Sequence, residues 1–304
     1  MNLIYEGPRS KVYDNGNHVV KEFPMKEAKA YINEVIINSL KVAGLLRSTG
    51  TYTNFDDDIP KLCIVYSKYD ITLDNFAENR ENMTFDNFRR IAYAMFINLR
   101  EMHSRNICHR DIKPQNILLN LVYHENETIV DMGELIFCDL SDCSINGTGP
   151  GGRGTAGYLS PDKMLAAELC HESSDIWSAG VTLVSILLGE NPFDGADVSD
   201  SCDPELDHYS VYNIIRYIGP IPQEYRDSED TEEDRLFSGT HLKFCPRGQP
   251  KFNKTLLYRR IFRATKYTKP EMKLVMKLIK SCLKVRAENR HSAAELVQLL
   301  EKGI

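Results

Sequence analysis

Short alternating runs of apolar and polar residues fill the beginning of the chain, a pattern typical of half-buried β-strands. Leu3–Tyr5 and Lys11–Tyr13 each have the length of a short strand. Asn15 and Gly16 form a hairpin-turn signal, and the strand-like run His18–Phe23 follows it. Because such a turn joins neighbouring antiparallel strands, these runs predict the start of a sheet.

The next segment changes to the spacing of a helix. Asp56–Asp58 and Pro60 then interrupt the pattern, and Lys61–Tyr66 resumes it as a buried strand. The first seventy residues therefore predict a small β-rich unit with one helix. The apolar residues that predict this helix, between Lys26 and Leu40, are Ala28, Ile32, Val35, Ile36 and Leu40.

Beyond this unit the pattern is mainly helical. One face of a long helix is apolar over residues 88–102, and Ile176–Leu188 is apolar nearly all round, as expected for a buried helix. Asn146–Gly157 is a glycine-rich loop between structured segments. Ser292 and Glu295 form a capping box that opens the last helix. The larger part of the chain is therefore predicted to be helical.

Composition narrows the class of protein. The 304 residues carry 37 Lys and Arg against 43 Asp and Glu, a formal net charge of −6, which argues against a general nucleic-acid coat. Met1–Asp14 lacks a secretory apolar core, and Val181–Leu188 is too short to span a bilayer. The eight cysteines are scattered, which favours reduced thiols. We expect a soluble intracellular protein, cytoplasmic or nuclear, without a membrane or direct nucleic-acid partner.

The strongest chemical signal is an ordered run of eight residues directly after the long helix. Residues 109–116 read His-Arg-Asp-Ile-Lys-Pro-Gln-Asn and match every fixed position of the H-R-D-x-x-x-x-N catalytic loop of protein kinases. Phosphoryl transfer needs a carboxylate near the attacking hydroxyl, a role that suits Asp111. It needs a cation against the charge on the moving phosphate, which suits Lys113. It also needs oxygen ligands for Mg²⁺, one of which the Asn116 amide supplies.

A second carboxylate that binds Mg²⁺ is expected on the β-hairpin after this loop. Asp139 follows the apolar strand Leu135–Phe137 and meets that expectation. Residues 139–141 resemble the kinase D-F-G motif, with Ser141 in place of the glycine. The metal ligand is kept, so the serine affects the flexibility of the segment more than metal binding.

Two later segments also resemble kinase motifs. Gly154–Asp162 is similar to the end of an activation segment, in which Thr155 takes the place of a threonine that contacts the catalytic Asp and Lys. Asp175 opens a D-x-W-S-x-G run. The resemblance implies that Asp175 holds the catalytic-loop backbone, and it could also cap the helix. Arg290 matches the late arginine whose partner would here be Asp162.

The chain thus resembles the eukaryotic-type protein kinase superfamily, serine/threonine branch, over nearly all of its length. The resemblance implies an α+β bilobal fold that forms one protein kinase domain over residues 1–304. A small β-rich N-lobe with one helix would cover residues 1–68, and a larger, mainly helical C-lobe residues 69–304. ATP is held in the cleft between such lobes together with Mg²⁺.

The glycine loop expected over the ATP phosphates is degenerate. Aligned on residues 11–13, the G-x-G-x-x-G-x-V pattern retains only Gly7, with Tyr5 and Ser10 at the other two glycine positions. Glycine allows the backbone to approach phosphates closely, so these departures could weaken nucleotide binding. Arg9 at the tip could touch phosphate or substrate, or it could be solvated.

Three further N-lobe roles follow from the resemblance. Lys21 is expected to grip the α- and β-phosphates, with a glutamate partner on the following helix. Glu34 is the preferred partner and Glu27 the alternative, because their i, i+7 spacing puts both on roughly the same helix face. Tyr66, in the strand and hinge that receive adenine, is expected at the position that controls the back pocket.

We therefore expect an active serine/threonine protein kinase that transfers the γ-phosphate of ATP to protein hydroxyls. A pseudokinase scaffold that binds partners is the alternative, favoured by the degenerate glycine loop and Ser141. The catalytic and metal-binding residues that remain in place argue against it. A second alternative is a small-molecule kinase of related fold, whereas Lys113, Pro114 and residues 155–162 point to protein substrates.

The activation segment and a later insert bear on control and substrate choice. Gly151 lies near the usual phosphosite, with Thr148 and Ser144 as the nearest hydroxyls, which predicts activity without activation-loop phosphorylation. Residues 211–244 loosely resemble the insert region of the cyclin-dependent and SR-protein kinase group. Acidic runs beside it could attract Arg- or Lys-rich protein substrates, or form a solvated loop. The reduced N-lobe suggests a viral or otherwise reduced kinase.

Overall fold

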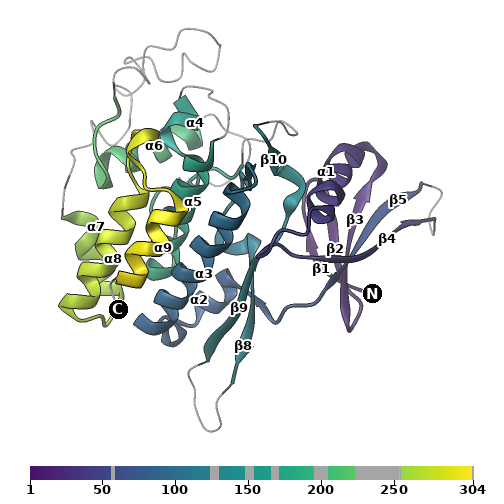
Figure 1. The fold of residues 1–304 in the computed structure, drawn as a ribbon, viewed down its shortest axis with the longest axis horizontal. Coiled ribbons are helices and arrows are strands. Elements are labelled where there is room, and N and C mark those ends of the chain that lie inside the picture. Colours follow the sequence, from purple (N-terminus) through teal and green to yellow (C-terminus); the bar gives the residue numbers. More distant parts are fainter. Residues whose placement is uncertain are drawn as a thin grey trace.

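A β-rich part and a helical part make up the fold (Figure 1). The computed structural model describes residues 1–55, 59–123, 130–147, 154–165, 171–194, 205–222, 253 and 255–302. In Figure 1 the five-stranded sheet and helix α1 lie at one end of the molecule and the helices at the other. The mixed α+β architecture expected from the sequence is therefore observed.

The β-rich part is built on an antiparallel sheet with the strand order β1-β2-β3-β5-β4. The predicted strands are confirmed, and Gly16, with a φ of +78°, forms the turn between the second and third of them. The fourth strand was not predicted, because nearly all of its residues are polar or small and exposed. The strands are β1 (Asn2–Glu6), β2 (Lys11–Asp14), β3 (His18–Pro24), β4 (Ser48–Asn54) and β5 (Lys61–Ser67).

Helix α1 (Ala28–Ser39) follows a short 3₁₀ turn, η1 (Met25–Glu27), and packs beside the sheet. The apolar face predicted for it is wrong. Ile32 and Ile36 are 53% and 44% exposed, and Leu40 is exposed as well. The face turned inward instead carries Ala30, Glu34 and Ile37. The physical reason is that Glu34 is buried as the partner of a buried lysine, so this ion pair decides which face is covered.

The helical part is organised around α3 (Phe85–His103) and α5 (Glu172–Leu188). Residues 174–187 of α5 are all buried, which confirms the buried helix predicted over Ile176–Leu188 except at Leu188, which is partly buried. The capping box of Ser292 and Glu295 is present, with the Ser292 amide donating to Glu295 Oε2 over 2.8 Å. The remaining helices are α2 (Leu73–Glu78), α4 (Pro161–Leu165), α6 (Glu205–Tyr217), α7 (Leu256–Ala264), α8 (Lys269–Cys282) and α9 (Ala293–Lys302).

Short strands flank the loops between the β-rich part and the helical part. Strands β6 (Ile71–Thr72), β8 (Ile117–Val122) and β9 (Asp131–Phe137) form one small sheet, and β7 (Ile107–Cys108) pairs with β10 (Ser144–Ile145). The end of β9 is tied to the β-rich part through two backbone hydrogen bonds of 2.8 Å, one to Gly44 and one from Leu46. This attachment places the segment that follows β9 between the sheet and the helices.

The described residues can be compared with the expectations that the cysteines are reduced and that no segment spans a membrane. The described cysteines, at positions 63, 108, 138, 143 and 282, are all free thiols, whereas Cys170, Cys202 and Cys245 lie outside them. Among the helices whose residues are described, none combines the length and apolar character needed to cross a membrane.

Candidate active site

The loop between β7 and the 3₁₀ turn η3 (Pro114–Asn116) is held in place from the buried helix α5. Asp175 accepts hydrogen bonds from the amides of His109, at 2.8 Å, and Arg110, at 2.9 Å, and it also contacts His103 Nε2 at 3.1 Å. Burial would raise the pKa of Asp175, but these partners, His103 foremost, lower it. They also hold Arg110 at its positive φ of +75°.

The alternative role considered for Asp175, that of a helix cap, is wrong. Helix α5 starts one turn earlier, and His171 is the residue at its N-cap position. Asp175 lies in the first turn, so its carboxylate is free to turn away from the helix terminus and bind the loop. The sequence did not reveal this because the residues before Asp175 are polar and continue the helix without an apolar pattern.

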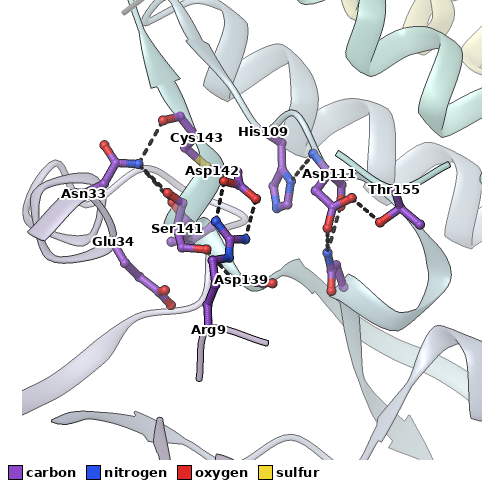
Figure 2. A network of polar contacts seen from close by, with 12 residues as sticks. Arg9, Asn33, Glu34, His109, Asp111, Asp139, Ser141, Asp142, Cys143 and Thr155 are labelled. Carbon is purple, nitrogen blue, oxygen red and sulfur yellow. Dashed lines mark hydrogen bonds and ion pairs between the residues drawn. The ribbon is translucent and has the colours of Figure 1, made fainter. Parts of the chain in front are cut away.

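Asp111, Lys113 and Thr155 lie together, although Thr155 is separated from the other two along the chain. Asp111 Oδ1 accepts a hydrogen bond from Thr155 Oγ1 at 2.6 Å, and Asp111 Oδ2 accepts one from Asn116 Nδ2 at 2.8 Å. Lys113 Nζ donates to Thr155 Oγ1 at 2.6 Å and lies 3.1 Å from Asp111 Oδ2. The carboxylate of Asp111 is thus fixed by three side chains. Figure 2 shows the contact between Asp111 and Thr155.

A second cluster of charges lies on the side of the β-rich part. Lys21 Nζ, on β3, is 2.7 Å from Glu34 Oε2 and 2.6 Å from Asp139 Oδ1. The structure therefore pairs Lys21 with Glu34 rather than with Glu27. Burial alone would lower the pKa of Lys21, yet the charges of Asp139 and Glu34 raise it above its ordinary value, so the group carries its positive charge.

Tyr66, near the end of strand β5, also binds Glu34. Its hydroxyl donates to Glu34 Oε1 at 2.6 Å. Burial, followed by the negative charge of Glu34, raises the pKa of Tyr66 well above its ordinary value, so the hydroxyl keeps the proton that it donates. Both oxygens of Glu34 are therefore engaged, one by Lys21 and one by Tyr66.

Asp139 and Asn116 offer oxygen atoms of the kind that Mg²⁺ prefers. The Asn116 amide nitrogen donates to both the backbone and the carboxylate of Asp111, which leaves its carbonyl oxygen for a metal. Desolvation would raise the pKa of Asp139, but Lys21, with a hydrogen bond from Ser141, lowers it below its usual range. Asp139 is thus ionised at neutral pH, and the donor set fits a hard divalent cation.

Asn33 is a site residue that the sequence did not reveal. From α1 its amide nitrogen donates to the carbonyls of Ser141, at 3.0 Å, and Cys143, at 2.9 Å, and it lies 3.4 Å from the carbonyl of Leu140 (Figure 2). These carbonyls belong to the segment around the 3₁₀ turn η4 (Leu140–Asp142), directly after Asp139. Asn33 therefore joins the helix that carries Glu34 to the segment that carries Asp139.

The loop between β1 and β2 carries Gly7 and Arg9. A Cβ on Gly7 would lie 2.6 Å from the hydroxyl of Tyr5, so a larger residue there would displace the exposed Tyr5 ring. Arg9, for which phosphate contact and solvation were both considered, is paired with Asp142 instead, with nitrogen–oxygen distances of 2.7 and 2.5 Å. No pattern along the chain links these two residues, which are 133 positions apart.

A comparison with family models decides which fold family this arrangement belongs to. Residues 12–299 match the model of the protein kinase domain. The chain belongs to the protein kinase family. Its β-rich amino-terminal part and its helical carboxy-terminal part are the two regions of that kinase fold, as the sequence resemblance implied. The match starts after the β1–β2 loop, so Gly7 and Arg9 precede it.

Individual relatives are distant. The kinase is 27% identical over 225 residues to the serine/threonine-protein kinase US3 homolog of varicella-zoster virus, covering 73% of this chain and 53% of that protein. It is 26% identical over 248 residues to the probable serine/threonine-protein kinase nek3 of Dictyostelium discoideum, covering 78% and 20%. It is 31% identical over 140 residues to the serine/threonine-protein kinase SAPK1 of rice, covering 45% and 38%. The kinase thus spans about half or less of the length of these relatives.

Arg290 of the kinase is buried against α4 and α5. Its guanidinium donates to Asp162, to the carbonyl of Ser173 at 3.1 Å and to that of Lys284 at 2.8 Å. It also lies over the ring of Trp177, with 5.2 Å from its central carbon to the ring centroid. The pair inferred from the sequence motif is therefore present, and it joins the last helices to the end of the activation segment.

Several expectations lie outside the described residues of the kinase. Thr148 and Gly151 of the activation segment are among them, as is most of the insert over residues 211–244. The acidic runs expected beside that insert fall there too, apart from Asp194 and the backbone of residues 205–207 in α6. Ser144, the other hydroxyl near the phosphosite, is described and lies buried in β10.

Proposed function

We propose that this protein kinase is active and transfers the γ-phosphate of ATP to serine or threonine hydroxyls of protein substrates. The observation that carries the proposal is the carboxylate of Asp111, which Thr155, Asn116 and Lys113 hold from three sides. Across from it, Lys21 is paired with Glu34 and Asp139. These two clusters provide a proton acceptor, a phosphate-binding cation and metal ligands in one place.

Each residue has a distinct part in the proposed reaction. A carboxylate oxygen can accept more than one hydrogen bond, so Asp111 can receive the substrate hydroxyl and its proton while Thr155 holds its orientation. Lys113 lies beside Asp111 and offsets negative charge on the phosphate during transfer. Lys21 would bind the α- and β-phosphates, with Tyr66 and Glu34 behind it.

Asn116 and Asp139 would hold Mg²⁺ at this site. The bound ion neutralises charge on the phosphate oxygens. Ser141, which donates to Asp139 Oδ1 at 3.0 Å, supports the orientation of that carboxylate, a contact that a glycine in its place could not make. The departure from the family motif thus adds a hydrogen bond to the proposed metal ligand.

A pseudokinase scaffold is the second candidate, favoured by Tyr5 and Ser10 at glycine positions of the β1–β2 loop. One labelling experiment distinguishes the two candidate functions. Purified protein is incubated with γ-labelled ATP, Mg²⁺ and a mixture of protein and small-molecule acceptors, and the labelled amino acids and small molecules are identified. Phosphoserine or phosphothreonine supports the proposed function. Nucleotide binding without transfer of label supports the scaffold, and label on small molecules alone supports a small-molecule kinase.

We also propose that residues 1–304 act as one kinase domain, with the lobes meeting at residues 68 and 69, in the connection from β5 to β6. Its proposed substrates are basic proteins, because acidic runs were identified near the insert. A degenerate peptide library tests this preference. Enrichment of Arg or Lys near the phosphorylated residue is expected, and an even distribution would remove the proposal about basic substrates.

We expect activity without phosphorylation of the activation segment. The expectation rests on Gly151 near the usual phosphosite, and Asn33 adds a bond from α1 to the first part of the segment, at residues 141 and 143. Phosphatase-treated protein and the Thr148→Ala variant should retain wild-type activity within about twofold, whereas Asn33→Ala should lower it about tenfold by loosening that tie. Loss of activity on phosphatase treatment, in protein that remains folded by circular dichroism, would refute this expectation.

A further inference from the structure

The ion pair of Arg9 and Asp142 joins two segments that meet at the proposed active site. Arg9 is at the tip of the β1–β2 loop, and Asp142 is in η4, three residues after Asp139. The two guanidinium NH groups each face one carboxylate oxygen, at 2.7 and 2.5 Å, so the pair is bidentate (Figure 2). This geometry fixes orientation as well as distance.

Asp142 depends on this partner. Its side chain is only 8% exposed, whereas that of Arg9 is 35% exposed. Removing one member of a buried ion pair leaves an uncompensated buried charge, which is strongly unfavourable. The hydrogen bond to Asp142 raises the pKa of Arg9 above its ordinary value, against the opposing effect of burial. Arg9 is therefore held at Asp142 and is not released easily to another anion.

The segment that carries Asp142 is itself held in place by hydrogen bonds. Asn33 binds the carbonyls of residues 140, 141 and 143, on both sides of Asp142. The carboxylate of Asp142 is thus presented from a segment that is bonded to α1. The pair therefore links the tip of the β1–β2 hairpin to a segment that is bonded to α1.

The loop, in turn, has lost the usual means of closing over phosphates. Two of its three glycine positions are Tyr5 and Ser10, so its backbone cannot approach phosphates as freely as a glycine-rich loop. Gly7 donates instead to the carbonyl of Ser10 at 2.9 Å. The loop tip nevertheless reaches the site, because Arg9 is bonded to Asp142 and lies near Asp139 (Figure 2).

We propose that the Arg9–Asp142 pair is a clamp that fixes the β1–β2 loop over the nucleotide cleft and replaces the missing glycines in positioning ATP. The inference rests on the proposed function in that the cleft must take ATP. Arg9 is a positioning residue here: it acts by holding the loop to η4. Its loss should leave the cleft chemically complete but open, so bound nucleotide should escape faster.

A double-mutant cycle tests the clamp by nucleotide binding alone. The dissociation constant and dissociation rate of a fluorescent ATP analogue with Mg²⁺ are measured for wild type, Arg9→Met, Asp142→Asn, the double variant and the charge swap Arg9→Asp/Asp142→Arg. Each single change should weaken binding on the order of tenfold, mostly through faster dissociation. The double variant should bind the analogue no more weakly than either single variant, and the charge swap should recover part of the lost affinity.

Lys11→Met is the matched control. It removes a cation from the same hairpin whose partner, Glu6, forms an exposed pair with it, so binding should change less than about twofold. Thermal unfolding confirms that each variant is folded. Amide hydrogen exchange over residues 6–11 provides a measurement that needs no nucleotide, and exchange there should be faster in Arg9→Met and Asp142→Asn than in Lys11→Met.

Three outcomes would overturn the clamp. Weaker binding in Arg9→Met but not in Asp142→Asn would mean that Arg9 contacts phosphate directly. Tighter binding of the ATP analogue in either single variant would mean that the pair opposes nucleotide binding. Unchanged exchange over residues 6–11 would mean that the pair does not hold the loop. Nucleotide binding that follows the cycle without any phosphate transfer would instead refute the proposed activity and leave the clamp in place.

Discussion

Replacement of Asp111 by alanine is expected to lower the rate of phosphate transfer by about 10²–10⁴-fold, the contribution of a positioned general base. The change removes the carboxylate that Thr155, Asn116 and Lys113 hold. Lys21, Glu34 and Asp139 are untouched, so ATP should still bind. The loss should therefore appear in kcat, with the dissociation constant for ATP changed by less than about threefold.

Initial rates over a range of ATP concentrations, together with direct nucleotide binding, measure both quantities. Asp86→Asn is a suitable control, because Asp86 is an exposed carboxylate in the first turn of α3 that pairs only with Arg89 and Arg90 among the contacts of the described chain. It should leave kcat unchanged. Equal rates for Asp111→Ala and wild type would show that label is transferred by some other means and would sink the assignment of Asp111.

Replacement of Arg290 by methionine is expected to destabilise the fold by about 3–5 kcal/mol, the effect of removing one partner of a buried ion pair. The guanidinium side chain of Arg290 is fully buried, and Asp162 is nearly so. The variant would leave the Asp162 carboxylate without its cation and would remove the hydrogen bonds that Arg290 donates to the carbonyls of Ser173 and Lys284. The predicted loss is a large part of the stability of an ordinary domain.

Urea denaturation followed by tryptophan fluorescence measures this effect, since Trp177, the single tryptophan, lies against Arg290. Arg90→Met is the matched control: it removes an exposed arginine paired with Asp86 and should change the free energy of unfolding by less than about 1 kcal/mol. A loss in Arg290→Met no larger than in the control would contradict the structural role of the pair.

The parts of the site that the sequence predicted well are those whose residues are contiguous or occur in a fixed order. Asp111, Lys113 and Asn116 lie within one eight-residue run, and their spacing follows from the loop that carries them. Strand β3 and the buried helix α5 were predictable for a related reason, since each shows its burial directly in its apolar pattern.

Contacts between distant segments could not be read from the chain. Glu27 and Glu34 are equivalent in the helical spacing expected from the sequence, but the structure places Glu27 in the turn before α1 and pairs Glu34 with Lys21. Asn33 has no neighbouring pattern that marks it, because its partners are backbone carbonyls of residues more than a hundred positions away. The buried face of α1 was predicted wrongly for the same reason. A hydrophobic pattern does not include the carboxylate of Glu34, whose burial decides which face of the helix points inward.

The bonding of the segment after Asp139 also bears on which small molecules could inhibit the protein. An inhibitor that binds beside Asp139 in the observed arrangement meets a carboxylate already held by Lys21 and Ser141. A compound that needs this segment to swing outward must break both of those contacts and the bonds from Asn33 at once. Because a ligand can shift a conformational equilibrium only by its difference in affinity for the two states, compounds of the second kind start at a disadvantage. Screening for inhibitors should therefore favour molecules that fit the site with Asp139 held by Lys21 and Ser141.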